Sequence, residues 1–269
     1  MLTPNQPIGI FDSGIGGLTI AKAIKKELPN EQIIYFGDTL HLPYGDKSAN
    51  SIQNYALKIA SFLEQQNCKI IVIACNSASA VAEKLLSDKY KHHLSIVNVI
   101  DPTIALVAKS TQNKKVGLIG TKRTVSTGIY KRKLKKANPN ISLFSKATPL
   151  LAPMIEEGFF NNKISKTVIN SYLANHHLQE IDTLILGCTH YPLINKEIKT
   201  YYNGKVNVVD SSAVTAKEVG RKLKELNLLN HTKPQSDIFF VSEYTTGFEK
   251  AAKIFFNKSI KLMAYKLFE

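Results

Sequence analysis

Short apolar runs alternate with longer segments of helical spacing along the first hundred residues. The apolar runs are residues 8–11, 33–36, 70–74 and 96–100. The helical segments between them are residues 18–28, 51–65 and 75–86. In the first of these, Leu18, Ala21 and Ile24 fall on one face. The last apolar run is expected to end at Asp101, before a further helix. Strands that alternate with helices in this way predict an α/β fold with a parallel sheet.

The same order of strands then occurs a second time. Its apolar runs are residues 116–119, 141–144, 184–186 and 206–209. In both sets the third run ends in a cysteine, first Cys75 and then Cys188. We therefore predict two pseudo-symmetric parallel-sheet, Rossmann-like domains that face each other across a cleft.

The expected domain boundaries follow from this repeat. Residues 102–210 would form the second domain, which carries Cys188 and His190. Residues 1–101 would form the first, which carries Asp12 and Cys75, and the tail at 211–269 would return to it. In that tail we expect a helix over 213–226, a strand over 238–241 and a last helix around 248–256.

The two cysteines stand where an active site is expected. In open α/β sheets, functional residues lie just past the carboxyl ends of the strands. Cys75 is followed by Asn76 and Ser77, and Cys188 by Thr189 and His190. Cys75 also precedes a predicted helix, whose positive end would lower the pKa of the thiol. We therefore expect the two thiols to face one shared site.

Composition narrows the class of protein. The chain has 269 residues and 44% hydrophobic content, with no apolar run near the roughly 20 residues of a membrane span. Residues 1–7 lack the basic and apolar segments of a secretory signal. Three cysteines are too few for a disulfide framework, so we expect a reduced, cytoplasmic protein. The formal charge of +14 comes mostly from lysine, which favours a solvated surface over a nucleic-acid site.

Two loops each have two possible roles that the sequence does not decide between. Residues 12–17 read DSGIGG between a strand and a helix. Such a turn either binds an anion at the helix N-terminus or only makes a tight turn. The loop at Pro43, Tyr44 and Gly45 is either an ordinary turn or a donor of backbone N–H groups to a carboxylate.

Two opposed thiols suit proton transfer at carbon. One thiolate removes a proton, and a thiol on the other face returns one. Asp12 would assist one thiol and His190 the other. Hydroxyl and amide groups at Asn76, Ser77, Thr121 and Thr189 would bind a carboxylate and an ammonium. This set is suited to inversion at the Cα atom of an amino acid. Cys/His spacing of the structural zinc kind is absent, so we expect no metal.

The sequence resembles the glutamate racemases of the cofactor-independent aspartate/glutamate racemase superfamily. The matching motifs are GIFDSGIGGL from residue 9, YFGDT from 35, LPYG from 42, ACNSA from 74, GT at 120 and GCTHYPL from 187. They span residues 8–210 in the family's order. One departure is Ser77, where the family usually has threonine. The hydroxyl is kept, so substrate binding should persist with slightly looser packing.

The resemblance implies interconversion of L- and D-glutamate, to supply D-glutamate for peptidoglycan, without pyridoxal phosphate or metal. Cys75 would act on D-glutamate and Cys188 on L-glutamate, assisted by Asp12 and His190. The residues that would bind substrate are Asp12, Ser13, Pro43, Tyr44, Gly45, Cys75, Asn76, Ser77, Thr121, Cys188, Thr189 and His190. Glu156 or its neighbour Glu157 would lie near the site, and Asp38 is a further candidate. A homodimer is implied as well.

Three alternatives remain. Aspartate racemases tend to have glutamate at the position of His190, which favours glutamate as the substrate here. The two thiols could instead form a redox switch, which requires Cα atoms within about 7 Å. A nucleic-acid-binding protein would show steeply salt-dependent DNA binding.

Overall fold

The computed structural model describes residues 2–268. The strands are β1 (Ile8–Asp12), β2 (Ile33–Gly37), β3 (Ile70–Ile73), β4 (Ser95–Asn98), β5 (Lys115–Gly120), β6 (Ser142–Ala147), β7 (Thr183–Gly187), β8 (Asn207–Asp210), β9 (Ile238–Val241) and β10 (Leu262–Ala264). The helices are α1 (Leu18–Glu27), α2 (Ala49–Gln65), α3 (Asn76–Tyr90), α4 (Ile100–Ser110), α5 (Lys122–Ser126), α6 (Ile129–Ala137), α7 (Leu151–Glu156), α8 (Lys163–Leu173), α9 (Asn195–Tyr201), α10 (Ser212–Glu225) and α11 (Thr246–Phe256). Short 3₁₀ helices lie at Tyr44–Asp46, His176–Leu178 and Tyr191–Ile194.

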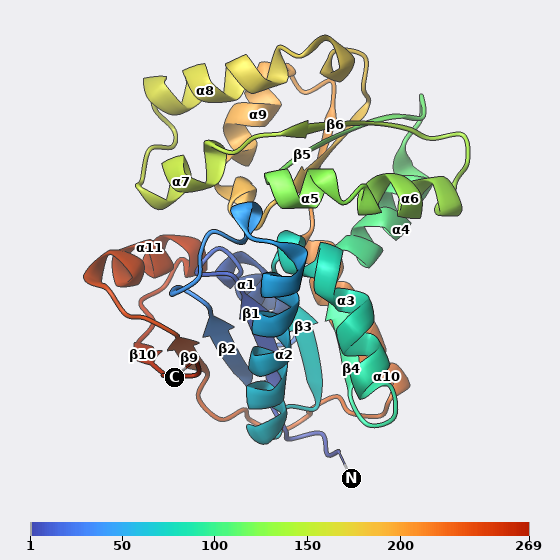
Figure 1. Ribbon diagram of the computed structural model, residues 1–269. Helices are drawn as coiled ribbons and strands as arrows, with labels where there is room; N and C mark the ends of the chain where they lie inside the picture. The colour runs from blue at the N-terminus through green and yellow to red at the C-terminus, as the bar shows by residue number, and fades with distance from the viewer. Residues whose placement is uncertain (1, 269) are drawn as a thin grey trace.

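The strands form two separate parallel sheets, which confirms the predicted fold class. Sheet A has the order β10-β9-β2-β1-β3-β4, and sheet B has the order β6-β5-β7-β8. Within each sheet, the four repeated strands have the same arrangement of second, first, third and fourth. The strands that precede the two cysteines, β3 and β7, therefore occupy equivalent places. Figure 1 shows the two domains one above the other, with the strands of sheet A pointing toward the sheet B domain.

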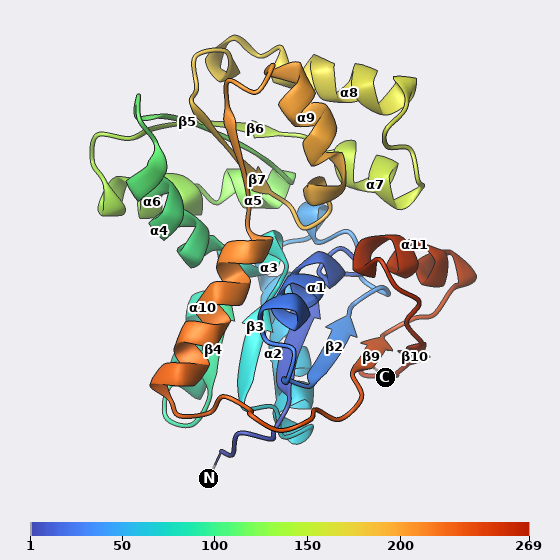
Figure 2. The ribbon, with the colours of Figure 1, turned by 180° about the vertical axis from the view of Figure 1, so that it is seen from behind.

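Helices cover both faces of sheet A. In Figure 1, α2 and α3 lie in front of the sheet, and the view from behind in Figure 2 shows α1 and α10 on the other face. The strands are buried on both sides, with all five residues of β1 and of β2 shielded from solvent. This explains why they appear in the sequence as continuous apolar runs rather than as alternating ones.

The C-terminal segment contributes to sheet A. β9 pairs with β2, and β10 pairs with β9. α10 packs beside α1 (Figure 2). Residues 1 and 269, the outermost residues of the expected first domain, lie outside the described part. The boundaries at 102 and 210 stay predictions.

One predicted strand is too long. The apolar run over 96–100 predicts a strand that ends at Asp101, whereas β4 ends at Asn98 and α4 begins at Ile100. The side-chain oxygen of Asn98 accepts hydrogen bonds from the backbone N–H groups of Ile100 at 2.8 Å and Asp101 at 2.9 Å. These bonds satisfy the first N–H groups of a helix, so Val99 leaves the strand and Ile100 becomes helical. The three-residue strand β10 is an element that the sequence pattern does not reveal.

Candidate active site

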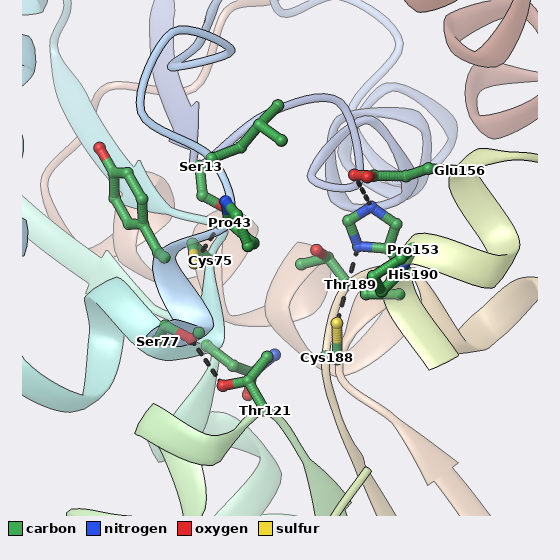
Figure 3. A pocket seen from close by; sticks show the side chains of 15 residues that line it. Ser13, Pro43, Cys75, Ser77, Thr121, Pro153, Glu156, Cys188, Thr189 and His190 are labelled. Carbon is green, nitrogen blue, oxygen red and sulfur yellow. Dashed lines mark hydrogen bonds and ion pairs between the residues drawn. The ribbon is translucent and has the colours of Figure 1, made fainter. Parts of the chain in front are cut away.

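A cavity of about 270 Å³ lies between the two domains, at the carboxyl ends of their strands. Figure 3 shows the side chains around it. The lining residues are Ser13, Leu42, Pro43, Tyr44, Gly45, Cys75, Asn76, Ser77, Thr121, Ala152, Pro153, Glu156, Cys188, Thr189 and His190. Cys75 enters from the sheet A domain and Cys188 from the sheet B domain. The structure therefore brings both thiols to one small cavity.

The thiol of Cys75 is held at the start of α3. It accepts a hydrogen bond from the backbone N–H of Ala78 at 3.4 Å and donates one to the hydroxyl of Ser13 at 3.5 Å. The expected lowering of its pKa is wrong. Burial raises the pKa of Cys75 to about 12, the nearby Asp12 adds to the rise, and the bonds to Ala78 and Ser13 offset only part of it. Cys75 is therefore a neutral thiol at neutral pH.

Cys188 begins a chain of three polar side chains on the other side. Its sulfur lies 3.6 Å from Nδ1 of His190, whose Nε2 lies 2.7 Å from Oε1 of Glu156 (Figure 3). Burial lowers the pKa of His190, but Cys188 and Glu156 outweigh it and raise the pKa well above its ordinary value. The ring therefore holds a proton beside the sulfur. Glu157 is exposed, so the structure places Glu156 at the site.

The two aspartates named from the sequence lie behind the lining rather than in it. Asp12 is fully buried and accepts a hydrogen bond from the backbone N–H of Gly14 at 3.1 Å. Burial raises its pKa, and the nearby His190 partly opposes that rise. Within residues 2–268, its Oδ1 atom has no hydrogen-bond partner. This buried acceptor, on a carboxyl that interacts electrostatically with both His190 and Cys75, is thus left free.

Asp38 supports the loop that lines the cavity. Its carboxylate accepts a hydrogen bond from the Tyr44 hydroxyl at 2.6 Å and another from the Ser242 hydroxyl at 3.0 Å. Nδ1 of His41 lies 2.9 Å from the same carboxylate. Asp38 therefore joins the loop that lines the cavity to the chain that follows β9, and it lies outside the cavity lining itself.

The glycine-rich turn permits a close approach between the domains. A Cβ atom on Gly16 would lie 2.4 Å from the ring of His190 and 2.6 Å from Oγ1 of Thr189. Such contacts are far shorter than any real Cβ contact, so only glycine fits there. Of the two roles left open by the sequence, the structure supports tight packing at Gly16, while Ser13 from the same turn lines the cavity.

Further polar contacts cross the cavity floor. The hydroxyls of Ser77 and Thr121 lie 2.8 Å apart, one from each domain (Figure 3). The side chain of Thr121 also caps α5 by accepting a hydrogen bond from the backbone N–H of Thr124 at 3.1 Å. Nearby, the guanidinium of Arg123 donates two hydrogen bonds to the carbonyl of Lys47, at 2.9 and 2.6 Å. The cavity is therefore closed on this side by direct bonds between the domains.

Some lining residues were not predicted from the sequence. Leu42, Ala152 and Pro153 are among them. Ala152 and Pro153 precede Glu156 by four and three residues in α7, and residues so spaced share a face of a helix. Helical spacing would have found both once Glu156 was chosen. Tyr130 was also missed, although its hydroxyl contacts Asn76.

Three further findings concern the thiols, metal binding and membrane-spanning helices. All three cysteines are free thiols. Across residues 2–268, no group of three or more His, Cys, Asp or Glu side chains is arranged to hold a metal ion. In the same range, no helix combines the length and the apolar character of a membrane span.

Comparison with known proteins identifies the family. The model of the Asp/Glu/hydantoin racemase family matches residues 18–219. The chain is 40% identical to the glutamate racemase of Geobacter metallireducens over 253 residues, which cover 94% of this chain and 93% of that one. The crystal structure of glutamate racemase from Francisella tularensis subsp. tularensis SCHU S4 in complex with D-glutamate has a TM-score of 0.92 and 39% identity, covering 98% of this chain and 99% of that chain.

A more distantly related structure is also that of a glutamate racemase. Escherichia coli glutamate racemase, in complex with L-glutamate and the activator UDP-MurNAc-ala, has a TM-score of 0.75 and 26% identity, covering 92% of both chains. The chain therefore belongs to the Asp/Glu/hydantoin racemase family and, within it, to the glutamate racemases, which are isomerases.

Proposed function

We propose that this protein interconverts L- and D-glutamate by proton transfer at Cα between Cys75 and Cys188. The observation that carries the proposal is the pair of thiols at the ends of the equivalent strands β3 and β7, both facing one cavity. The cavity volume of about 270 Å³ suits an amino acid rather than a large cofactor-bound substrate. Complexes of relatives with D-glutamate and with L-glutamate support the choice of substrate.

The two thiols differ in the charge around them, and this sets their roles. The protonated ring of His190 stabilises negative charge on the sulfur of Cys188 3.6 Å away. Cys75 is neutral because burial raises its pKa to about 12. The surroundings of the two thiols thus support Cys188 as the base and Cys75 as the acid in the conversion of L-glutamate.

Each proton is accounted for in the reaction. The thiolate of Cys188 takes the Cα proton of L-glutamate, so an S–H bond forms, the C–H bond breaks, and the electron pair stays on Cα in conjugation with the α-carboxylate. The thiol of Cys75 then gives its proton to the opposite face of Cα. D-glutamate results, with a thiol at Cys188 and a thiolate at Cys75. The reverse reaction runs from that state, and Asp12 and His190 assist these transfers.

The remaining lining residues would hold the substrate. Backbone and side-chain groups of Ser13, Pro43, Tyr44 and Gly45, which line the cavity, would contribute to binding. We propose that the substrate is also bound by Asn76, Ser77, Thr121 and Thr189. Asp12 and Asp38 act behind the lining, Asp12 through its charge and Asp38 through Tyr44. The product would serve peptidoglycan synthesis in the cytoplasm, and the protein would be a homodimer.

The proposal is tested by incubating the purified protein with D-glutamate in deuterium oxide. Optical rotation and the Cα proton signal are followed together. We expect optical activity to decay while deuterium enters at Cα. The same measurement with D-aspartate tests the choice of substrate, because turnover of aspartate alone would keep the chemistry and change the substrate. No exchange with either amino acid in folded, reduced protein would contradict the proposal.

Single-thiol variants separate the two-thiol mechanism from simpler ones. Cys75→Ala and Cys188→Ala should each abolish racemisation while the protein stays folded. Cys68→Ala is the matched control, because Cys68 is a buried thiol that packs against Gly9 away from the cavity. Near-normal racemisation by either cavity variant would rule out the paired thiols.

A further inference from the structure

The side chain of Asn76 has one end bound and the other free. Asn76 opens α3, lines the cavity beside Cys75 and is only 2% exposed. A carboxamide has an acceptor oxygen and two N–H donors. Here Oδ1 accepts a hydrogen bond from the Tyr130 hydroxyl at 2.7 Å. Nδ2, by contrast, is buried without a hydrogen-bond partner among residues 2–268.

An unsatisfied buried donor is costly, so one that is kept in a cavity lining calls for an explanation, and a ligand that accepts its hydrogen bond supplies one. Because Asn76 is part of the cavity lining, its free donors are available to a bound molecule with acceptor oxygens. A carboxylate is the natural match, since it only accepts hydrogen bonds when ionised.

The partner of Asn76 belongs to the other domain. Tyr130 lies on α6, which follows β5 of sheet B, whereas α3 follows β3 of sheet A. Its ring is 1% exposed, and burial raises the pKa of its hydroxyl above the ordinary value. The hydroxyl therefore keeps its proton and donates it to the carboxamide. A carboxamide that was turned over would present Nδ2 to this donor and lose the bond.

We propose that Tyr130 is a positioning residue, whose hydroxyl fixes the carboxamide of Asn76 so that its N–H groups serve a substrate carboxylate. Without that bond the amide can rotate and place its oxygen against the carboxylate, which repels it. Because the bond joins the two domains, Asn76 is oriented for substrate only when they are together. This inference rests on the proposed function, which supplies the carboxylate.

The test compares Tyr130→Phe with Tyr202→Phe. Tyr202 is also a buried tyrosine of the sheet B domain, and its hydroxyl donates to the carbonyl of Leu178 at 3.2 Å, away from the cavity lining. Each variant loses one buried hydroxyl. We expect Tyr130→Phe to lower kcat/KM for both enantiomers about tenfold, mainly through a higher KM, as loss of a binding contact does. Tyr202→Phe should stay close to wild type.

A double-mutant cycle tests whether Tyr130 acts through Asn76. In the Asn76→Ala background, adding Tyr130→Phe should cause no further loss. All variants are assayed at a temperature where circular dichroism shows them folded. Equal effects of the two tyrosine variants, or an additive loss in the Asn76→Ala background, would overturn the inference while wild-type turnover upheld the proposed function. Wild-type protein that leaves glutamate unchanged would overturn the proposed function, and this inference with it.

Discussion

At the scale of single residues, the most informative contact is that of Glu156 with His190. Nε2 of His190 lies 2.7 Å from Oε1 of Glu156, and the side chains are 6% exposed at His190 and 25% exposed at Glu156. Replacing Glu156 by glutamine removes one of the two charges that raise the pKa of His190, and leaves burial, which lowers it. We expect the pKa of His190 to fall in Glu156→Gln, as followed by NMR of the labelled imidazole nitrogens.

The same change has a consequence for stability with a definite sign. In the folded protein, the pKa of His190 lies above the unfolded value of about 6.5. Its proton therefore stabilises the fold fully below that pH, and this contribution is lost as the pH rises through the folded pKa. Glu156→Gln should shrink the contribution. Glu157→Gln is the control, since Glu157 is exposed. If the pKa of His190 were the same in both variants, the pairing of His190 with Glu156 would be wrong.

At the scale of elements, the turn between β1 and α1 shows how a small residue fixes the site. A Cβ atom on Gly16 would overlap His190 and Thr189, whereas one on Gly14 would meet only Leu42 at an ordinary 3.6 Å. Overpacking of this kind costs roughly 1–3 kcal/mol. We expect Gly16→Ala to lose activity by displacing His190, in addition to being destabilised by about that amount. Gly14→Ala should be nearly neutral, and thermal unfolding together with kcat measures both.

Full activity of Gly16→Ala would show that the turn and β7 can move apart without harm. A loss in Gly14→Ala as large as in Gly16→Ala would point instead to the backbone of the turn.

The strands were largely predictable because buried parallel strands leave continuous apolar runs, whereas the helices α5 to α9 were not predicted. The exceptions have local causes. Asn98 caps a helix where apolar residues suggested a longer strand, and β10 is only three residues long. The positions of the two thiols could be predicted from the repeat of strands. The neutral state of Cys75 could not, because burial outweighs the effect of the helix terminus there. Contacts such as Tyr130 with Asn76 depend on how two domains meet, which no local pattern encodes.

At the scale of the whole molecule, a buried ion pair joins three distant parts of the chain. Lys69 and Glu31 are 0% and 2% exposed at their side chains. The ammonium of Lys69 also donates to the carbonyls of Pro4 and Leu228, and Glu31 accepts a hydrogen bond from the backbone N–H of Asn230. The pair thus ties the first residues and the C-terminal segment to the amino end of β3, opposite the cavity.

Removing one partner should cost far more than removing both. Lys69→Met leaves the carboxylate of Glu31 buried without its cation, which typically costs about 3–5 kcal/mol. The double variant Lys69→Met/Glu31→Met removes both charges and should recover much of this loss. Chemical denaturation measures the free energy of unfolding of each. Because the pair lies at the far end of sheet A, kcat of the folded variants should stay near wild type. A single variant as stable as the double one would mean that solvent reaches Glu31, and a loss of kcat in either would mean that this end of the sheet is coupled to the cavity.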